Sequence, residues 1–165
     1  IPEGIKNWPE KGTYLWVAGT RADPFFYTRK EILEIINKTK RKHINPSNVE
    51  TGGCANNTID QMMWATELLK KNDKINHLIL TTAAYHTPRC VLTCLQTMNK
   101  QSIRRIIISP IPIYHPSGPS LESEEFCGEL SRISKYREKG DVASSKLWEE
   151  YVKWRSEFIN NLNII

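Results

Sequence analysis

Hydrophobic positions follow two alternating patterns along this chain. Short runs rich in β-branched and aromatic residues, at 13–18, at 103–109 and within 75–89, predict strands. Between these runs, apolar residues recur at the 3.6-residue spacing of amphipathic helices. Strands that alternate with helices pair in parallel through right-handed crossovers. We therefore predict a single three-layer α/β/α, Rossmann-like domain over residues 1–165, with a mostly parallel sheet of four or five strands.

Capping and turn residues predict where these elements begin and end. Thr28 and Asn57 are predicted helix N-caps, Gly19 is predicted to end the first strand, and Gly140 to stop a helix. Residues 1–12 are predicted to be an irregular lead-in, and the helix after Thr28 is predicted to end near residue 42. A brief strand at 48–50 and a loop at 51–56 follow. A proline-rich loop is predicted at 110–119, and C-terminal helices at 119–165 are predicted to pack on the body.

The stretch 75–89 joins a predicted central strand to the helix that follows it. Its apolar run predicts a buried strand, Thr87 is the predicted N-cap, and Pro88 suits the first helical position. His86 and Arg89 would then flank the positive end of a helix, just past the carboxyl end of a strand. In an open α/β sheet, this is where ligands bind.

Polar residues from four strand-to-helix loops are predicted to converge on the same edge of the sheet. Two helix N-termini, near residues 58 and 88, together with Arg21 and Arg89, favour an anionic ligand such as a phosphate or carboxylate. The residues predicted to line this edge are Gly19, Thr20, Arg21, Asp23, Glu50, Asn56, Asn57, Thr58, Tyr85, His86, Arg89, Tyr114 and His115.

His86 and Glu50 are the predicted acid–base pair, because imidazole titrates near neutral pH. Structural interpretations stay open beside this one: Asn57 and Thr58 can cap a helix, and Glu50 can pair with an arginine to hold the loops. The sequence has no Gly-x-Gly-x-x-Gly after the first strand, no phosphate-binding loop ending in Lys-Ser/Thr, and no Gly-x-Ser-x-Gly. The pattern predicts a ligand site without naming a reaction.

Composition and charge narrow the class of protein. A hydrophobic content of 39% and a net charge of +5 are typical of a globular protein, and no apolar run approaches the roughly 20 residues of a membrane span. The basic run 38–43 lacks interleaved aromatic residues, so we expect a solvated helix end rather than a nucleic-acid surface. We expect a cytoplasmic protein; because residue 1 is Ile, a removed signal peptide or anchor is the alternative. The oligomeric state is left open.

The cysteines predict buried thiols more than metal ligands. Four cysteines make no disulfide framework in a chain of 165 residues, which favours a reducing compartment. His86, Cys90 and Cys94 do share one helical face at i, i+4 and i+8, but zinc ligands are usually spaced more closely and need a fourth partner. We therefore expect no metal here, and treat Cys90 and Cys94 as small apolar side chains.

Three blocks of the sequence resemble the YdcF-like family (SanA/ElyC-type proteins), a bacterial domain of unknown function. The blocks are Glu50, then Asn57-Thr58-Ile59-Asp60-Gln61, then Tyr85-His86 followed by Arg89 at the end of the central strand. The resemblance implies a Rossmann-like domain with Glu50, Asn57, Thr58, Asp60, His86 and Arg89 lining one pocket. Asp60-Gln61 stands where the family has Glu-Asn, and Gly19-Thr20 replaces a more glycine-rich turn.

Three functions follow as hypotheses. The leading one is an enzyme, either a hydrolase or a transferase, that acts on a small phosphorylated or nucleotide-like substrate. The second is a regulatory module that binds a nucleotide or an S-adenosylmethionine-type ligand without turnover, since open α/β folds host both kinds. The third is an interaction domain in envelope biogenesis, which an exposed face at Trp148 and Trp154 would favour.

Overall fold

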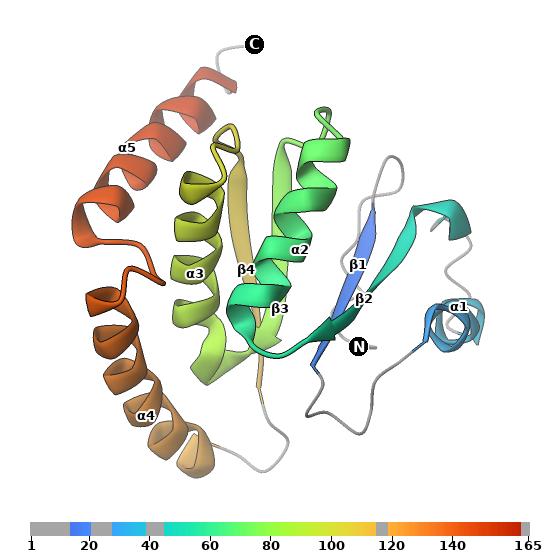
Figure 1. Cartoon of the computed structure of the whole chain (residues 1–165), viewed down its shortest axis with the longest axis horizontal. Coiled ribbons are helices and arrows are strands. Elements are labelled where there is room, and N and C mark those ends of the chain that lie inside the picture. The colour runs from blue at the N-terminus through green and yellow to red at the C-terminus, as the bar shows by residue number, and fades with distance from the viewer. Residues whose placement is uncertain (1–13, 21–27, 39–44, 115–118, 163–165) are drawn as a thin grey trace. The chain divides into compact units, whose positions relative to one another are not determined.

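The computed structural model of the chain describes residues 14–20, 28–38, 45–114 and 119–162 (Figure 1). The described residues form a mixed α/β structure with five α-helices and two small parallel sheets of two strands each. The chain divides into two compact units, residues 1–65 and 66–165. Among the described residues, no helix combines the length and apolar character that crossing a bilayer requires.

The first unit is built on a parallel pair of strands, β1 (Leu15–Thr20) and β2 (Val49–Ala55). Helix α1 (Arg29–Lys38) packs Ile32 and Ile36 against Leu15 and Val49 to form a small core. The short 3₁₀ helix η1 (Pro46–Asn48) precedes β2, and α2 (Thr58–Lys71) follows it, ending in the second unit.

Thr28 caps α1, which confirms the prediction. The Glu31 backbone N–H donates to Thr28 Oγ1 at 3.3 Å, and the Thr28 N–H donates to Glu31 Oε2 at 2.7 Å. This reciprocal arrangement is a capping box. The helix ends at Lys38, and the rest of the predicted basic run lies outside the described residues, as do the lead-in 1–12 and the loop residues Arg21 and Asp23.

The predicted boundaries of both strands in this unit are wrong. β1 continues through Gly19 to Thr20, and β2 runs on to Ala55 through residues that were predicted as a loop. Strand pairing explains the extension, because Thr20 is the partner of Ala55 across a register shift. Gly52 suits this strand because a Cβ there would meet the Trp64 ring at 2.9 Å, closer than such atoms approach.

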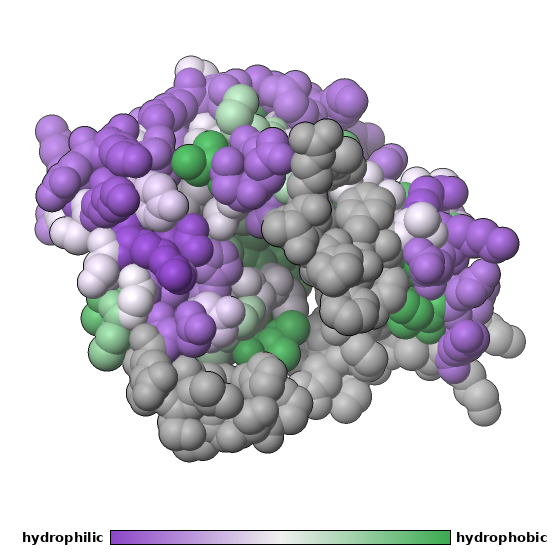
Figure 2. All heavy atoms as spheres, turned by 60° about the horizontal axis from the view of Figure 1, so that its bottom comes forward, coloured by the Kyte–Doolittle hydropathy of each residue, from purple (hydrophilic) through white to green (hydrophobic). Residues whose placement is uncertain are grey.

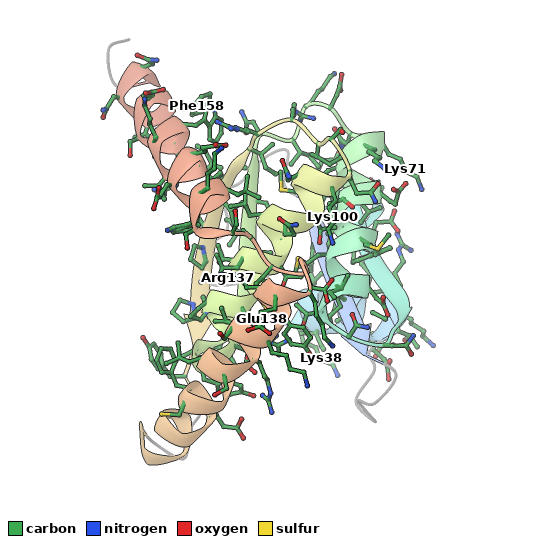
Figure 3. All side chains as sticks on the ribbon, turned by 60° about the vertical axis from the view of Figure 1, so that its left-hand side comes forward. Lys38, Lys71, Lys100, Arg137, Glu138 and Phe158 are labelled. Carbon is green, nitrogen blue, oxygen red and sulfur yellow. The ribbon has the colours of Figure 1, made fainter. Side chains whose placement is uncertain are left out.

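The second unit is built on β3 (His77–Ala83) and β4 (Ile107–Ile113), which pair in parallel. A 3₁₀ turn, η2 (Ala84–His86), leads from β3 into α3 (Thr87–Lys100), which packs on both strands. Helices α4 (Pro119–Glu138) and α5 (Ser145–Leu162) follow β4 in the chain. In Figure 3, Arg137 and Glu138 are labelled at the end of α4, and Phe158 is labelled in the later part of α5.

The predicted strand at 103–109 is shifted, because β4 begins at Ile107 and includes Pro110 and Pro112. The Ile107 N–H donates to Asn76 O at 2.9 Å, on the β3 side, whereas the Ile108 N–H donates to Tyr151 Oη at 2.7 Å. Residues 110 and 112 share the parity of Ile108, so their missing N–H groups cost no bond to β3. The prolines that predicted a loop are therefore tolerated in this strand.

Tyr151 fixes α5 on the edge of β4 while leaving neighbouring apolar residues partly open. Its buried hydroxyl accepts from Ile108 N and donates to Ile106 O at 3.3 Å. Trp148 and Val152, predicted to pack on the body, are instead exposed, because they flank Tyr151 on the helix surface.

Gly140 ends α4 as predicted: it has φ +72°, and the Asp141 N–H donates to Tyr136 O at 2.8 Å in a Schellman motif.

Candidate functional site

The site begins where β3 turns into α3. Helix α3 starts at Thr87, so its N-cap position falls on His86, which makes no side-chain cap and already has helical backbone angles (φ −86°, ψ −16°). The prediction of Thr87 as N-cap is therefore wrong, and its hydroxyl donates instead to Ala83 O at 3.0 Å. The 3₁₀ turn is the physical reason, since it carries the chain into helical geometry one residue early. His86 and Arg89 do flank the helix start.

A buried carboxylate from α4 lies between these two side chains. Glu129 is only 1% exposed, and its Oε2 lies 3.0 Å from His86 Nδ1. Arg89 donates to both carboxylate oxygens, from Nε to Oε2 and from Nη2 to Oε1, the latter at 3.1 Å. His86 and Arg89 also meet directly, with Nδ1 and Nη2 3.0 Å apart.

Two further residues of α4 complete the group. Arg132 Nη1 donates to Glu129 Oε1 at 2.6 Å, and the guanidinium of Arg89 lies over the Tyr136 ring at 5.6 Å from its centre. We call His86, Arg89, Glu129, Arg132 and Tyr136 the Glu129 cluster. It joins the start of α3 to α4 within the second unit, and only Arg132, with half of its side chain exposed, reaches far into solvent.

The carboxylate of Glu129 is charged over the whole physiological range. Burial alone would raise its pKa, but hydrogen bonds from Arg89, Arg132 and His86 outweigh burial and lower the pKa from the usual 4.5 to about 2. Within the Glu129 cluster, two arginines against one glutamate leave one surplus positive charge while His86 is neutral, and the negative charge of Glu125 acts on Arg132 from outside the cluster.

His86 is held in its neutral form near pH 7. Burial lowers its pKa below the usual 6.5, and the nearby charges of Arg89 and Arg132 act in the same direction, against the opposing effect of Glu129. A neutral imidazole that is positioned by a carboxylate can accept a proton from a substrate, which is the first requirement of general base catalysis.

The structure places the other predicted site residues as follows. Tyr85 lies in η2 with its ring centre 6.3 Å from that of His86. Glu50 is exposed on β2, and Gly19 and Thr20 belong to β1. Tyr114 is exposed just after β4, whereas Arg21 and His115 lie outside the described residues. The pairing of Glu50 with His86 stays a prediction.

The predicted residues at the start of α2 cap that helix. The Asp60 N–H donates to Asn57 Oδ1 at 3.0 Å, which confirms Asn57 as the N-cap, and the Asn56 N–H donates to Asp60 Oδ2 at 2.9 Å. Thr58 is buried in the first turn. The structural interpretation of Asn57 thus holds, and a ligand role for Asn57, Thr58 and Asp60 stays a prediction.

Sequence reasoning missed Glu129, Arg132 and Tyr136. They recur at i, i+3 and i+7, so they share one face of α4, which is a signal that the sequence does contain. The partners of Glu129 on α3 and at its start, Arg89 and His86, lie 40 and 43 residues earlier, and nothing in the local pattern connects the two segments.

The cysteines of α3 are buried thiols, as predicted. Burial raises the pKa of Cys90 to about 11 and that of Cys94 to about 12, so both are protonated at neutral pH. The described residues hold no group of three or more His, Cys, Asp or Glu side chains placed to bind a metal ion.

The two tryptophans of α5 differ in exposure, since Trp148 is exposed and Trp154 is partly buried. Trp148 is 39% exposed, but its ring centre lies 6.0 Å from that of buried Tyr151, and the centre of the partly buried Trp154 ring lies 5.7 Å from it on the other side. On the face seen in Figure 2, hydrophilic side chains predominate among the coloured residues, and hydrophobic ones form small separate patches. An interaction domain built on these tryptophans stays a prediction.

Comparison of the chain with protein-family models, with curated proteins and with solved structures found no match.

Proposed function

We propose that this chain is an enzyme that acts on a small phosphorylated or nucleotide-like anion, with His86 as its proton-transferring group. The observation that carries the proposal is the contact of His86 Nδ1 with the buried carboxylate of Glu129, itself held by Arg89 and Arg132. A carboxylate on one ring nitrogen orients the imidazole and stabilises its protonated form, as in other catalytic histidine–carboxylate pairs.

The charges around His86 support an anionic substrate. The Glu129 cluster has one surplus positive charge, and the start of α3 adds the partial positive charge of a helix N-terminus. Arg132 is the cationic side chain of the cluster that is most open to solvent, so we expect it to make the first contact with the anion. By the YdcF-like resemblance, Asn57, Thr58 and Asp60 stay in the proposal as ligand residues and Glu50 as an acid–base residue. Gly19, Thr20 and Arg21 stay in it as ligand residues because the sequence predicts them at the carboxyl end of a parallel strand.

A matched pair of histidine variants tests the proposal. The protein is incubated with a panel of sugar phosphates, nucleotides and S-adenosylmethionine, and products are sought by mass spectrometry. Replacing His86→Asn should lower any turnover by about 10²- to 10⁴-fold, the usual contribution of a general acid–base group. His77→Asn is the control, because His77 lies in the same unit and contacts Ser109 Oγ at 2.9 Å, outside the Glu129 cluster. Equal turnover in both variants would show that His86 takes no part in the reaction.

The same panel separates an enzyme from a binding module. A ligand that raises the melting temperature of the wild type but not of His86→Asn, and that is recovered unchanged, would favour the regulatory module over the enzyme. In the enzyme, turnover should fall on acidification through the lowered pKa of His86, because the protonated ring cannot accept a proton.

We also propose that the chain has the three-layer, Rossmann-like α/β/α fold, with a mostly parallel sheet of four or five strands, that the sequence predicts and the YdcF-like resemblance implies. The β–α–β order of both pairs supports this, and Tyr151 and the two prolines occupy the outer edge of β4, which leaves the other edge of β3 for a further strand. The N–H groups of Ile79 and Thr81 face that edge by the register of β3. Slow amide hydrogen exchange at both residues is expected, and fast exchange would contradict a continuous sheet.

A further inference from the structure

The Nδ1 atom of His86 has two neighbours that make opposite demands on it. Glu129 Oε2 and Arg89 Nη2 each lie 3.0 Å from this nitrogen. An ionised carboxylate can only accept a hydrogen bond, and a guanidinium can only donate one. The nitrogen must carry a proton to satisfy Glu129 and a lone pair to satisfy Arg89. A neutral imidazole therefore satisfies one neighbour at a time.

Neither neighbour depends on His86 for its charge balance. Glu129 accepts from Arg89 through both oxygens and from Arg132, while Arg89 also lies over the ring of Tyr136. Whichever tautomer His86 adopts, the buried carboxylate and guanidinium remain paired with each other. We therefore expect the two tautomers to differ little in free energy.

The choice of tautomer decides what Nε2 can do. If Nδ1 carries the proton and donates to Glu129, Nε2 has a lone pair and can act as a base. If Nδ1 accepts from Arg89, Nε2 carries the proton and can only donate. The neighbours of Nδ1 therefore decide whether Nε2 can accept a proton or can only donate one.

We propose that Glu129 and Arg89 are positioning residues that hold His86 in a mixture of both neutral tautomers, and that an anion binding Arg89 selects the tautomer protonated on Nδ1. The anion competes with His86 for the donors of Arg89, so the Nδ1–H···Glu129 bond forms and Nε2 becomes a base when the substrate is in place. The selection by an anion rests on the proposed function, whereas the mixture of tautomers does not.

Nitrogen NMR of the protein labelled with ¹⁵N-histidine tests the mixture first. The two ring nitrogens of a neutral histidine have well-separated shifts in a single tautomer and intermediate shifts in a rapidly exchanging mixture. We expect intermediate shifts for His86 in the ligand-free wild type above the pKa of the ring, with His86→Asn assigning the signals. Shifts of one pure tautomer would overturn the proposal. This measurement needs no destabilised variant.

Two matched variants test the roles of the arginines. Arg89→Met removes the donor to Nδ1 and should move His86 fully to the Nδ1-protonated tautomer. Arg132→Met removes the other arginine of Glu129 without touching the ring, and should leave the mixture unchanged. An unchanged mixture in Arg89→Met would overturn the competition for Nδ1.

Inorganic phosphate tests the selection by an anion. Added to the wild type, phosphate should move the shifts toward those of Arg89→Met, and it should have no effect on that variant. A shift without any turnover on the substrate panel would support the selection while contradicting the enzyme. No shift with phosphate, beside a normal response to Arg89→Met, would overturn the selection and leave the mixture of tautomers standing.

Discussion

The starts of α2 and α3 have the same place in the fold pattern, directly after a parallel strand, but satisfy their polar groups in opposite ways. At α2, Asn57 and Asp60 bond to backbone N–H groups three or four residues away. At α3, His86 makes no side-chain cap, and His86 and Arg89 reach Glu129, 43 and 40 residues along the chain. At the start of α2, local hydrogen bonds satisfy the polar groups. At the start of α3, the polar side chains bond instead to a buried carboxylate from the distant helix α4.

This difference separates polar residues that helix capping explains from polar residues that it does not explain. A cap satisfies orphan N–H groups and asks nothing of the rest of the molecule, which explains the polar residues at α2 without a ligand. A buried charged group costs several kcal/mol of desolvation in proteins unless it is paired, so a hydrophobic contact could have joined α3 to α4 more cheaply. Charges kept in such a place, beside a histidine with a lowered pKa, are typical of functional sites.

The largest effect is expected from removing the charge that joins α3 to α4. Glu129→Ala leaves Arg89 largely buried without its counter-charge, which should lower the free energy of unfolding by about 3 to 5 kcal/mol. Urea unfolding followed by circular dichroism measures this loss. Arg132→Ala is the control, because Arg132 is half exposed and Glu129 keeps Arg89, so the loss should be much smaller. Equal losses in the two variants would mean that burial of the charge does not matter.

The second prediction concerns pH. Because the pKa of Glu129 is about 2 in the folded protein and about 4.5 in the unfolded chain, its stabilisation is complete above pH 4.5 and is lost as the pH falls toward 2. His86 acts in the same sense at higher pH, since its lowered pKa favours protonation of the unfolded chain below pH 6.5. Unfolding measured from pH 7 to pH 2.5 should therefore show a steep loss in the wild type. Glu129→Gln, which cannot titrate, should flatten this loss between pH 4.5 and pH 2.5.

Most features that local chemistry decides were predictable from the sequence; the cap at Thr87 was not, because the 3₁₀ turn before α3 moves the N-cap to His86. The caps at Thr28 and Asn57 and the stop at Gly140 were predicted correctly, because a cap or a left-handed glycine is decided within a few residues. The ends of β2 and β4 were not, because they depend on a partner. In the sequence, Gly52 indicates a loop, and only its packing against Trp64 explains why it lies in a strand. Pro110 likewise indicates the end of a strand, and only the structure shows that its missing N–H faces away from β3.

About half of the candidate site was predictable from the sequence. His86 and Arg89 were placed together at a helix start from the Pro88 signal, and they do meet. Glu129 was missed because its partners come from segments about 40 residues away, and no alternation of polar and apolar residues encodes such a distance. The sequence held an acidic candidate for His86 in Glu50, whereas the carboxylate that contacts His86 within its own unit comes from α4.

A smaller effect is expected at the start of α2. Asn57→Ala removes the acceptor for the Asp60 N–H and should lower stability by about 1 kcal/mol, the usual value of an N-cap. Amide hydrogen exchange should quicken in the first turn of α2 and leave α3 unchanged. Asn57→Ser is the control, because serine caps equally well and should restore both measurements. A loss of several kcal/mol would indicate that Asn57 does more than cap the helix.

The smallest effect is expected from the charge of Asp60, and salt distinguishes it from Glu129. Asp60→Asn keeps an acceptor for the Asn56 N–H but removes a negative charge from the helix N-terminus, which is worth about 0.5 kcal/mol at low ionic strength. Because Asp60 is partly exposed, 1 M NaCl should screen most of that difference. Glu129 is buried among its arginines, so the loss caused by Glu129→Ala should persist in the same salt. If salt removed both effects alike, the charge at α3 would be as accessible to solvent as the charge at α2.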